Sequence, residues 1–126
     1  LARAMNARAS DLQAVGDRVK LVAEGAAALG VVRLNDGARV GEIRLSLEAG
    51  ELVIDGLCVD AEHRSYGAGS EAAWLLVSAA RSAGVALLRA WAHPNLGLSV
   101  YFWTRMGFSP RHGEGPEGGI WFERAL

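Results

Sequence analysis

Alternating apolar and polar positions predict two successive strands near the middle of the chain. Over residues 40–47, Ile43 and Leu45 point one way while Arg44 and Ser46 between them point to water. A strongly apolar run over residues 52–59 follows and predicts a buried strand. Before this pair, Asn35-Asp36-Gly37 predicts a hairpin turn, because Asp-Gly supplies the positive φ angles that a tight turn requires.

Apolar residues at helical spacing predict three helices, over residues 3–16, 69–83 and 96–106. Gly84 and Gly107 follow the second and third of them, in the position of a helix C-cap. The stretch over residues 19–34 is ambiguous, since its first part alternates like a strand and its alanines also suit a helix. We favour a strand over residues 27–34.

Three further strands are expected, over residues 86–92, 108–111 and 120–126. The last two are separated by residues 112–119, which are rich in glycine and predict a mobile loop that edges an acceptor site or is a solvated hairpin tip. A meander of three strands, then helix, strand, helix and two strands, implies an α+β (mixed α/β) fold.

Size and composition limit the possible functions. With 126 residues the chain forms one domain, residues 1–126. A net charge of −1 argues against nucleic acid as a partner, and no apolar run of 18 residues predicts a membrane span. A single cysteine, Cys58, suits a reducing compartment and hence the cytoplasm. Because the chain begins at Leu1, it leaves open a fragment, a processed form or a domain of a longer protein.

Residues 59–70 carry the motif with most chemical content. The strand ending at Val59 leads through a polar loop into a helix, and the loop contains Arg64, Gly67 and Gly69 as Arg-x-x-Gly-x-Gly. Glycines let backbone approach a ligand closely, and the free N–H groups of a first helical turn bind anions. Phosphate or pyrophosphate is the expected ligand; the alternative is a glycine-rich turn without one.

These residues resemble the acyl-CoA-binding motif of the GNAT superfamily of N-acetyltransferases. Leu57 and Val59 match the hydrophobic pair on the strand, and the Arg-x-x-Gly-x-Gly signature follows in register. The similarity continues through Asn95, the Gly107-Phe108 pair and the closing segment, and covers residues 38–126. It implies a GNAT-like fold, with a central, mostly antiparallel sheet splayed between two central strands and flanked by helices. Fewer residues than usual precede the hairpin, so the N-terminal part is short.

The resemblance implies that acetyl-CoA is a co-substrate. Its pyrophosphate would sit on backbone N–H groups of residues 66–70, and its pantetheine arm would pair with residues 57–59, where a backbone N–H would polarise the thioester carbonyl. Arg64 would pair with phosphate or brace the loop, and Asn95 would cap its helix or contact the arm. The implied cofactor-binding residues are Leu57, Cys58, Val59, Arg64, Ser65, Tyr66, Gly67, Ala68, Gly69, Ser70 and Asn95.

The catalytic candidates are less well defined. Asp55, two residues before Leu57 and so expected on its face, and His93, at the end of the next strand, are candidate general bases. The family often has a Tyr as general acid four residues before the Gly-Phe pair, but Trp103 occupies that position here. Water or no acid is then the first expectation, Tyr101 the second and Ser99 the third.

Cys58 lacks a neighbouring His or Lys and lies in an apolar strand, so we expect a buried structural residue and no acyl-enzyme. His and Cys spacing predicts no metal site. Trp91 and Trp121 lie on strands and are candidates for lining a cleft or a dimer seam.

The best-supported function is an acyl-CoA-dependent N-acyltransferase that moves acetyl to a small-molecule or peptide amine by direct attack. A GNAT-like module that binds acyl-CoA without turnover, as a sensor or regulatory domain, is the alternative, and a nucleotide-binding scaffold is a third. High apolar content in a small domain favours a homodimer.

Overall fold

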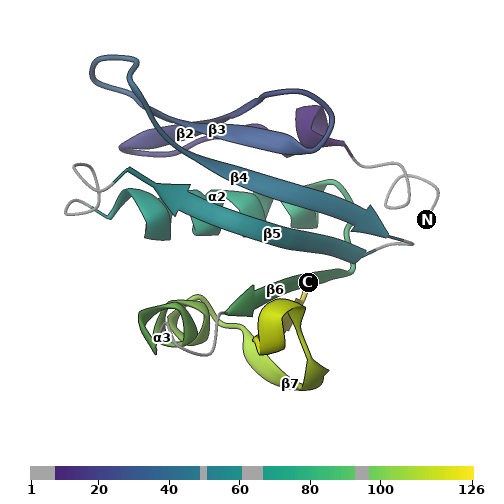
Figure 1. The fold of residues 1–126 in the computed structure, drawn as a ribbon. Helices are drawn as coiled ribbons and strands as arrows, with labels where there is room; N and C mark the ends of the chain where they lie inside the picture. The colour runs from purple at the N-terminus through teal and green to yellow at the C-terminus, as the bar shows by residue number, and fades with distance from the viewer. Residues whose placement is uncertain (1–7, 49–50, 61–66, 93–96) are drawn as a thin grey trace.

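The computed structural model describes residues 8–48, 51–60, 67–92 and 97–126 of the chain (Figure 1). These residues form a single eight-stranded sheet in the order β1-β2-β3-β4-β5-β6-β8-β7. The strands are β1 (Ala14–Val15), β2 (Val19–Ala23), β3 (Ala28–Arg33), β4 (Arg39–Glu48), β5 (Glu51–Val59), β6 (Leu87–Ala92), β7 (Ser109–Glu114) and β8 (Ile120–Ala125). The helices are α2 (Ala68–Ser82) and α3 (Gly97–Arg105), with 3-10 turns η1 (Ala9–Leu12) and η3 (Pro116–Gly118).

Neighbouring strands of this sheet run antiparallel except at its centre, where β5 and β6 run parallel. Their pairing begins at Glu51 opposite Leu87 and ends at Ile54 opposite Ala90. Both strands continue past that point, and Figure 1 shows them diverging. The expected fold, a mostly antiparallel sheet splayed between two central strands, is therefore confirmed.

Helix α2 covers one face of the sheet and holds the largest part of the core. It packs on η1, β1, β2 and β5, and in Figure 1 it lies behind β4 and β5. Its stripe of small and branched residues, with Ala72, Leu76 and Ala80 all buried, meets Leu12 and Leu21 from the N-terminal segment. Burial of this apolar face is what fixes the helix against the sheet.

The prediction of a helix over residues 3–16 is wrong for the part that the structure describes. Residues Ala9–Leu12 form only a 3-10 turn, and Ala14–Val15 pair with β2. Gln13 has extended backbone angles and its side-chain oxygen accepts the N–H of Ala23. Strand pairing and the burial of Leu12 thus outweigh the helical spacing, which is a local preference that tertiary contacts readily override. Residues 3–7 lie outside the described residues.

Most other predicted elements are confirmed. The β3–β4 hairpin turns at Gly37 with φ +74°, and Gly84 and Gly107, each at φ +84°, follow α2 and α3. The ambiguous stretch contains two strands, β2 and β3, joined by residues 24–27. The predicted mobile loop has more structure than expected, because β7 extends to Glu114 and η3 follows it. In the described part of the chain, no helix is long and apolar enough to cross a membrane.

Candidate functional site

The N-terminus of α2 lies directly beyond the end of β5 and presents uncapped backbone N–H groups. Gly67 is the N-cap in left-handed geometry, φ +79° and ψ +18°, and among the residues that the structure describes no side chain caps the helix. A first helical turn without a side-chain cap leaves donors for a ligand. Of the predicted phosphate-binding residues, Gly67, Ala68, Gly69 and Ser70 lie on this turn, whereas Arg64, Ser65 and Tyr66 fall outside the described residues.

The one acidic side chain of this first turn is engaged elsewhere. The Oε1 of Glu71 accepts the backbone N–H groups of Arg18 at 2.8 Å and Val19 at 3.0 Å. The same contact brings Arg18 beside the helix, where its Nη1 would lie 3.2 Å from a Cβ added at Gly67. A cation, Arg18, therefore stands at the predicted anion site, although the sequence pattern gave no sign of it.

The two glycines of the motif differ in what requires them. Gly67 has a backbone conformation that side chains rarely adopt. A Cβ on Gly69 would make only ordinary contacts, 3.6 Å from Val59 Cγ2 and 4.0 Å from Phe102 Cε1. Packing within the protein therefore leaves room for alanine at position 69.

Beyond Ile54, one edge of β5 is no longer paired with β6. Its other edge pairs with β4, with Ile43 opposite Leu57 and Gly41 opposite Val59, but β6 pairs no further than Ile54. Backbone groups along a strand edge can accept an added extended chain. Residues 57–59, the predicted partners of a pantetheine arm, lie in this part of β5.

The prediction that Cys58 is buried is wrong, and the prediction that it is a structural residue is not tested. Its side chain is exposed, not buried, because Leu57 and Val59 take the face that packs on the core and Cys58 takes the opposite face. An apolar run does not distinguish a strand buried on both faces from one buried on a single face. Its role as a structural residue and not a nucleophile stays a prediction.

Asp55 lies at a β-bulge and not on the face of Leu57. Arg44 pairs with Gly56 and Leu45 with Ile54, so Asp55 is an extra residue in β5. The bulge reverses the alternation, which puts Ile54 and Leu57 on the α2 side and leaves Asp55 exposed on the other. The Ser46 hydroxyl on β4 donates a hydrogen bond to the Asp55 carboxylate.

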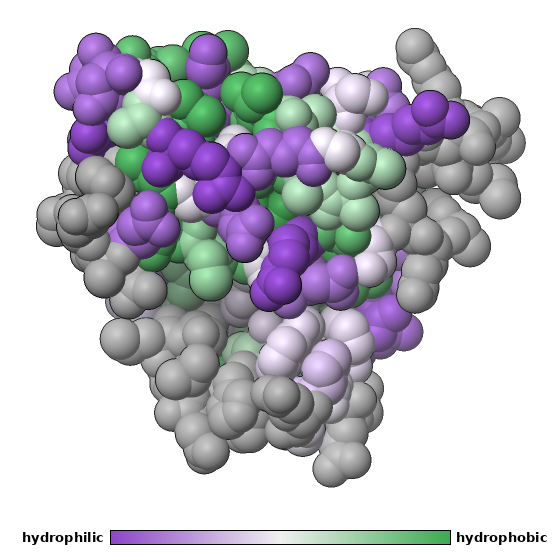
Figure 2. Space-filling view, turned by 45° about the horizontal axis from the view of Figure 1, so that its top comes forward, coloured by the Kyte–Doolittle hydropathy of each residue, from purple (hydrophilic) through white to green (hydrophobic). Residues whose placement is uncertain are grey.

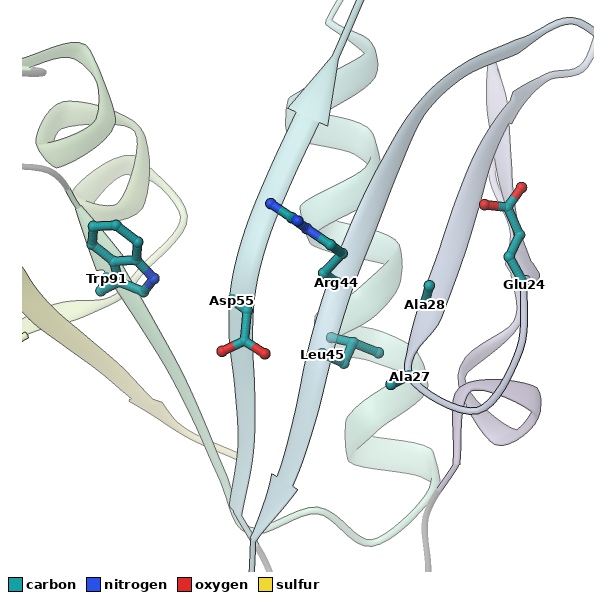
Figure 3. Close-up of a pocket in the computed structure, with 7 residues that line it drawn as sticks. All are labelled: Glu24, Ala27, Ala28, Arg44, Leu45, Asp55 and Trp91. Atoms are coloured by element: carbon teal, nitrogen blue, oxygen red, sulfur yellow. The ribbon is translucent and has the colours of Figure 1, made fainter. Parts of the chain in front are cut away.

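A pocket of about 580 Å³ opens on this other face of the sheet (Figure 3). It is lined by Glu24, Ala27, Ala28, Arg44, Leu45, Asp55 and Trp91. Figure 2 shows hydrophilic side chains gathered across the middle of the molecular surface, between apolar areas. Asp55, the predicted base, and Trp91, a predicted cleft residue, are thus brought together in one pocket.

The Glu24 carboxylate at the rim of the pocket already has a strong partner. Arg39 donates two hydrogen bonds to it, from Nε and Nη2, each of 2.7 Å. These hydrogen bonds and the guanidinium charge hold the pKa of Glu24 below its ordinary value of 4.5. Glu24 therefore remains a paired carboxylate at neutral pH.

Trp91 forms the β6 side of the pocket and is supported from behind by the η3 turn. A Cβ added at Gly119 would lie 2.8 Å from Trp91 Cε3, so the glycine backbone approaches the ring closely. On the neighbouring strand, Trp121 lies opposite Trp91 and carries the Arg89 guanidinium 4.4 Å from its ring centroid. The turn over residues 115–119 thus reaches the pocket through the Trp91 ring.

Helix α3 carries Trp103, at the position where the family often has its general acid, and the candidate acid Tyr101. Trp103 is buried and meets the ring of Phe108 at 4.9 Å, so it is part of the core. Tyr101 is 62% exposed, beside the guanidinium of Arg105, and does not line the pocket. His93 and Asn95 lie outside the described residues, and the side chain of Ser99 is likewise not described.

The fold and this site together define a class of protein. Its members have a mixed sheet in which two central parallel strands diverge, and the first of these strands is followed by a helix that begins at a glycine. A model of the acetyltransferase (GNAT) family matches residues 8–108. The chain belongs to the GNAT family of acetyltransferases. No curated protein sequence matches the chain.

Solved structures of GNAT proteins share the fold at low sequence identity. PaiA N-acetyltransferase from Thermoplasma acidophilum, solved in complex with coenzyme A, is 18% identical with a TM-score of 0.69 over 79% of this chain. A GNAT-family acetyltransferase from Bacillus anthracis is 18% identical with a TM-score of 0.71, over 80% of this chain and 67% of its own. Escherichia coli ribosomal-protein-S18-alanine N-acetyltransferase is 14% identical with a TM-score of 0.67, over 88% of this chain and 71% of its own. The chain spans 60% of the length of the Thermoplasma protein.

Sequence reasoning missed the side chains that β4 contributes to the pocket. Alternation places Arg44 and Ser46 on the water-facing side, and the structure agrees; Arg44 lines the pocket, and Ser46 contacts Asp55 beside it. What the pattern did not contain is the bulge, which brings Asp55 to the same face as these two. The Asp55-Gly56 pair inside an apolar strand is the signal that could have revealed it.

Proposed function

We propose that this protein is an acyl-CoA-dependent N-acyltransferase that transfers acetyl from acetyl-CoA to a primary amine. The observation that carries the proposal is the divergence of β5 and β6 beyond Ile54 and Ala90, together with the uncapped helix at Gly67. Membership of the GNAT family and the coenzyme A found in the Thermoplasma relative support it.

Acetyl-CoA would bind mainly through backbone groups. The N–H groups of residues 66–70 would hold the pyrophosphate, with Arg64 pairing to phosphate or bracing the loop. The pantetheine arm would lie along residues 57–59, on the side of β5 that faces β6, with Asn95 beside it. A backbone N–H of that edge would donate to the thioester oxygen as negative charge develops there.

The acceptor would enter from the pocket on the opposite face. Its neutral amine nitrogen attacks the thioester carbon, and the C–S bond breaks as the tetrahedral intermediate collapses. Asp55, directly or through water, takes the proton that the nitrogen loses, with His93 as the second candidate. Water protonates the departing thiolate, and Tyr101 is the next candidate for that task.

The acceptor class is a small-molecule or peptide amine. The pocket has room for one, and the E. coli relative bears the name of an alanine N-acetyltransferase for a ribosomal protein. The proposal includes no metal, nucleic acid or membrane component. A cytoplasmic homodimer remains our prediction, to be checked by sedimentation at tens of micromolar.

Two measurements test the proposal. Calorimetry with acetyl-CoA should show binding at one site per chain, and a panel of amines should release free coenzyme A thiol in proportion to acylated product. Binding without turnover of any amine would favour the sensor alternative. Absence of acetyl-CoA binding would contradict the proposal.

A further inference from the structure

Arg44 holds a guanidinium across β5 at the place where the central strands begin to part. Its Nη2 and Nε would lie 3.3 Å and 3.6 Å from a Cβ added at Gly56, so the side chain extends over that glycine. Figure 3 shows it reaching from β4 across β5 on the side where Trp91 lies. Gly56 is two positions beyond Ile54, where pairing with β6 ends.

The charged side chains of the pocket differ in whether they have a partner within the protein. Glu24 is paired with Arg39, and Asp55 accepts the Ser46 hydroxyl. Arg44 has no ion pair or hydrogen-bond acceptor among residues 8–48, 51–60, 67–92 and 97–126. A guanidinium presents a planar fork of donors that matches a carboxylate in a two-point contact.

This placement bears on the acceptor, if the proposed function holds. The acyl group would sit at residues 57–59. Arg44 lies over Gly56, the residue just before this stretch of β5, so its guanidinium would be close to the reacting carbon. A simple cationic amine would meet a positive charge there. An amine that also carries an anionic group would neutralise Arg44. That contact would orient the amine nitrogen of the acceptor toward the gap between β5 and β6.

We propose that the acceptor is an amino acid whose carboxylate binds Arg44. The α-amine then lies within reach of Asp55, and an apolar side chain faces Ala28 and Trp91. This inference rests on the proposed function for the transfer step, but the binding preference can be measured without turnover. Arg44 is an acceptor-binding residue in this scheme.

The experiment compares L-leucine with L-leucinamide, which has the same amine and side chain but no carboxylate. Binding of each is measured by calorimetry in the presence of coenzyme A, and KM and kcat are measured with acetyl-CoA. Arg44→Gln should weaken leucine binding and raise its KM by about tenfold to a hundredfold, as expected for a lost charge-assisted contact, while kcat changes little. Arg44→Lys should restore part of the loss.

Arg81→Gln is the matched control, because it removes the same charge from an exposed position in the last turn of α2. Leucine should be preferred to leucinamide in the wild type and in this control, and the preference should vanish in Arg44→Gln. Equal use of the two ligands, better use of leucinamide, or binding of neither would overturn the proposal. Acetyl-CoA binding and turnover of another amine would then still stand as separate support for the proposed function.

Discussion

The two faces of β5 differ in the kind of chemistry that they offer. Toward α2, the strand presents Leu52, Ile54 and Val59 to the core and leads into a helix whose backbone N–H groups are uncapped. Toward the opposite side, it presents Asp55 and Gly56 beneath the side chains of Ser46 and Arg44. The first face would act through backbone, and the second through side chains.

This difference explains why the face that would act through backbone could be predicted from the sequence. Backbone sites depend on glycine and on strand-loop-helix order, and both are visible in a short stretch of sequence. Side-chain sites depend on which residues share a face, and that requires the register. The proposed cofactor half could therefore be recognised from a local motif, whereas the pocket half could not.

The largest effect should come from a charge placed at the backbone face. Gly67→Asp puts a carboxylate at the phosphate position, and Asp tolerates positive φ better than most residues. Arg18 Nη1, 3.2 Å from the new Cβ, would help to accommodate it in the fold. Losing two charge-assisted hydrogen bonds should weaken acetyl-CoA binding about a thousandfold in calorimetry.

Gly25→Asp is the matched control, since Gly25 also has positive φ, +88°, and no atom within 4 Å of an added Cβ. It lies between β2 and β3 and should bind acetyl-CoA as the wild type does. Equal affinity of the Gly67 variant and this control would remove the α2 N-terminus from the cofactor site.

The next largest effect is expected on the face of β5 that would act through side chains. Asp55→Asn should lower kcat about a hundredfold, because a positioned general base contributes at least that much. Acetyl-CoA affinity should be unchanged. An unaltered rate would transfer the role to His93.

A much smaller effect is expected for Cys58→Ala, although Cys58 is next to the acyl position. The residue contributes backbone to the part of β5 beyond its pairing with β6, and its exposed side chain adds no packing in the core. We expect most of the turnover to remain. A well-folded variant without activity, or an acylated Cys58 found by mass spectrometry, would contradict direct attack.

The smallest effect concerns stability at the rim of the pocket. Because Arg39 lowers the pKa of Glu24 below 4.5, the pair stabilises the fold above that pH and the contribution is lost as the pH falls through the lowered pKa. The Tm of Glu24→Gln should therefore fall less steeply below about pH 4.5 than the Tm of the wild type. Parallel Tm curves would show that the ion pair is screened by solvent.

Most of the sheet could be predicted from the sequence, because its signals are local. Asp36-Gly37 fixes the β3–β4 hairpin, and alternation identifies β4. The N-terminal segment could not, since Ala9–Leu12 has helical spacing but the residues that follow it are held by pairing of β1 with β2 and by Glu71 of α2. Glu71 accepts N–H groups from Arg18 and Val19, more than 50 positions away, and no local pattern contains such a contact.

The site was predictable to the same extent. Gly67 and Gly69 lie at the helix start that the motif indicated, and Trp91 lines a cleft as expected. The faces of Asp55 and Cys58 were misassigned because each depends on a structural detail, a bulge in one case and one-sided burial in the other. The pocket contribution of Arg44 follows only from its position above Gly56.

The bulge at Asp55 makes the effect of a deletion in β5 depend on where it falls. Deleting Asp55 or Gly56 would remove the extra residue and restore strict alternation from Glu51 onward, so Leu57 and Val59 would still face the core and Cys58 would still face away from it. Deleting Val53, in the regular part of the strand, would instead reverse the faces of the residues on one side of the deletion. A single-codon deletion should therefore be tolerated at the bulge and should be disruptive elsewhere in the same strand.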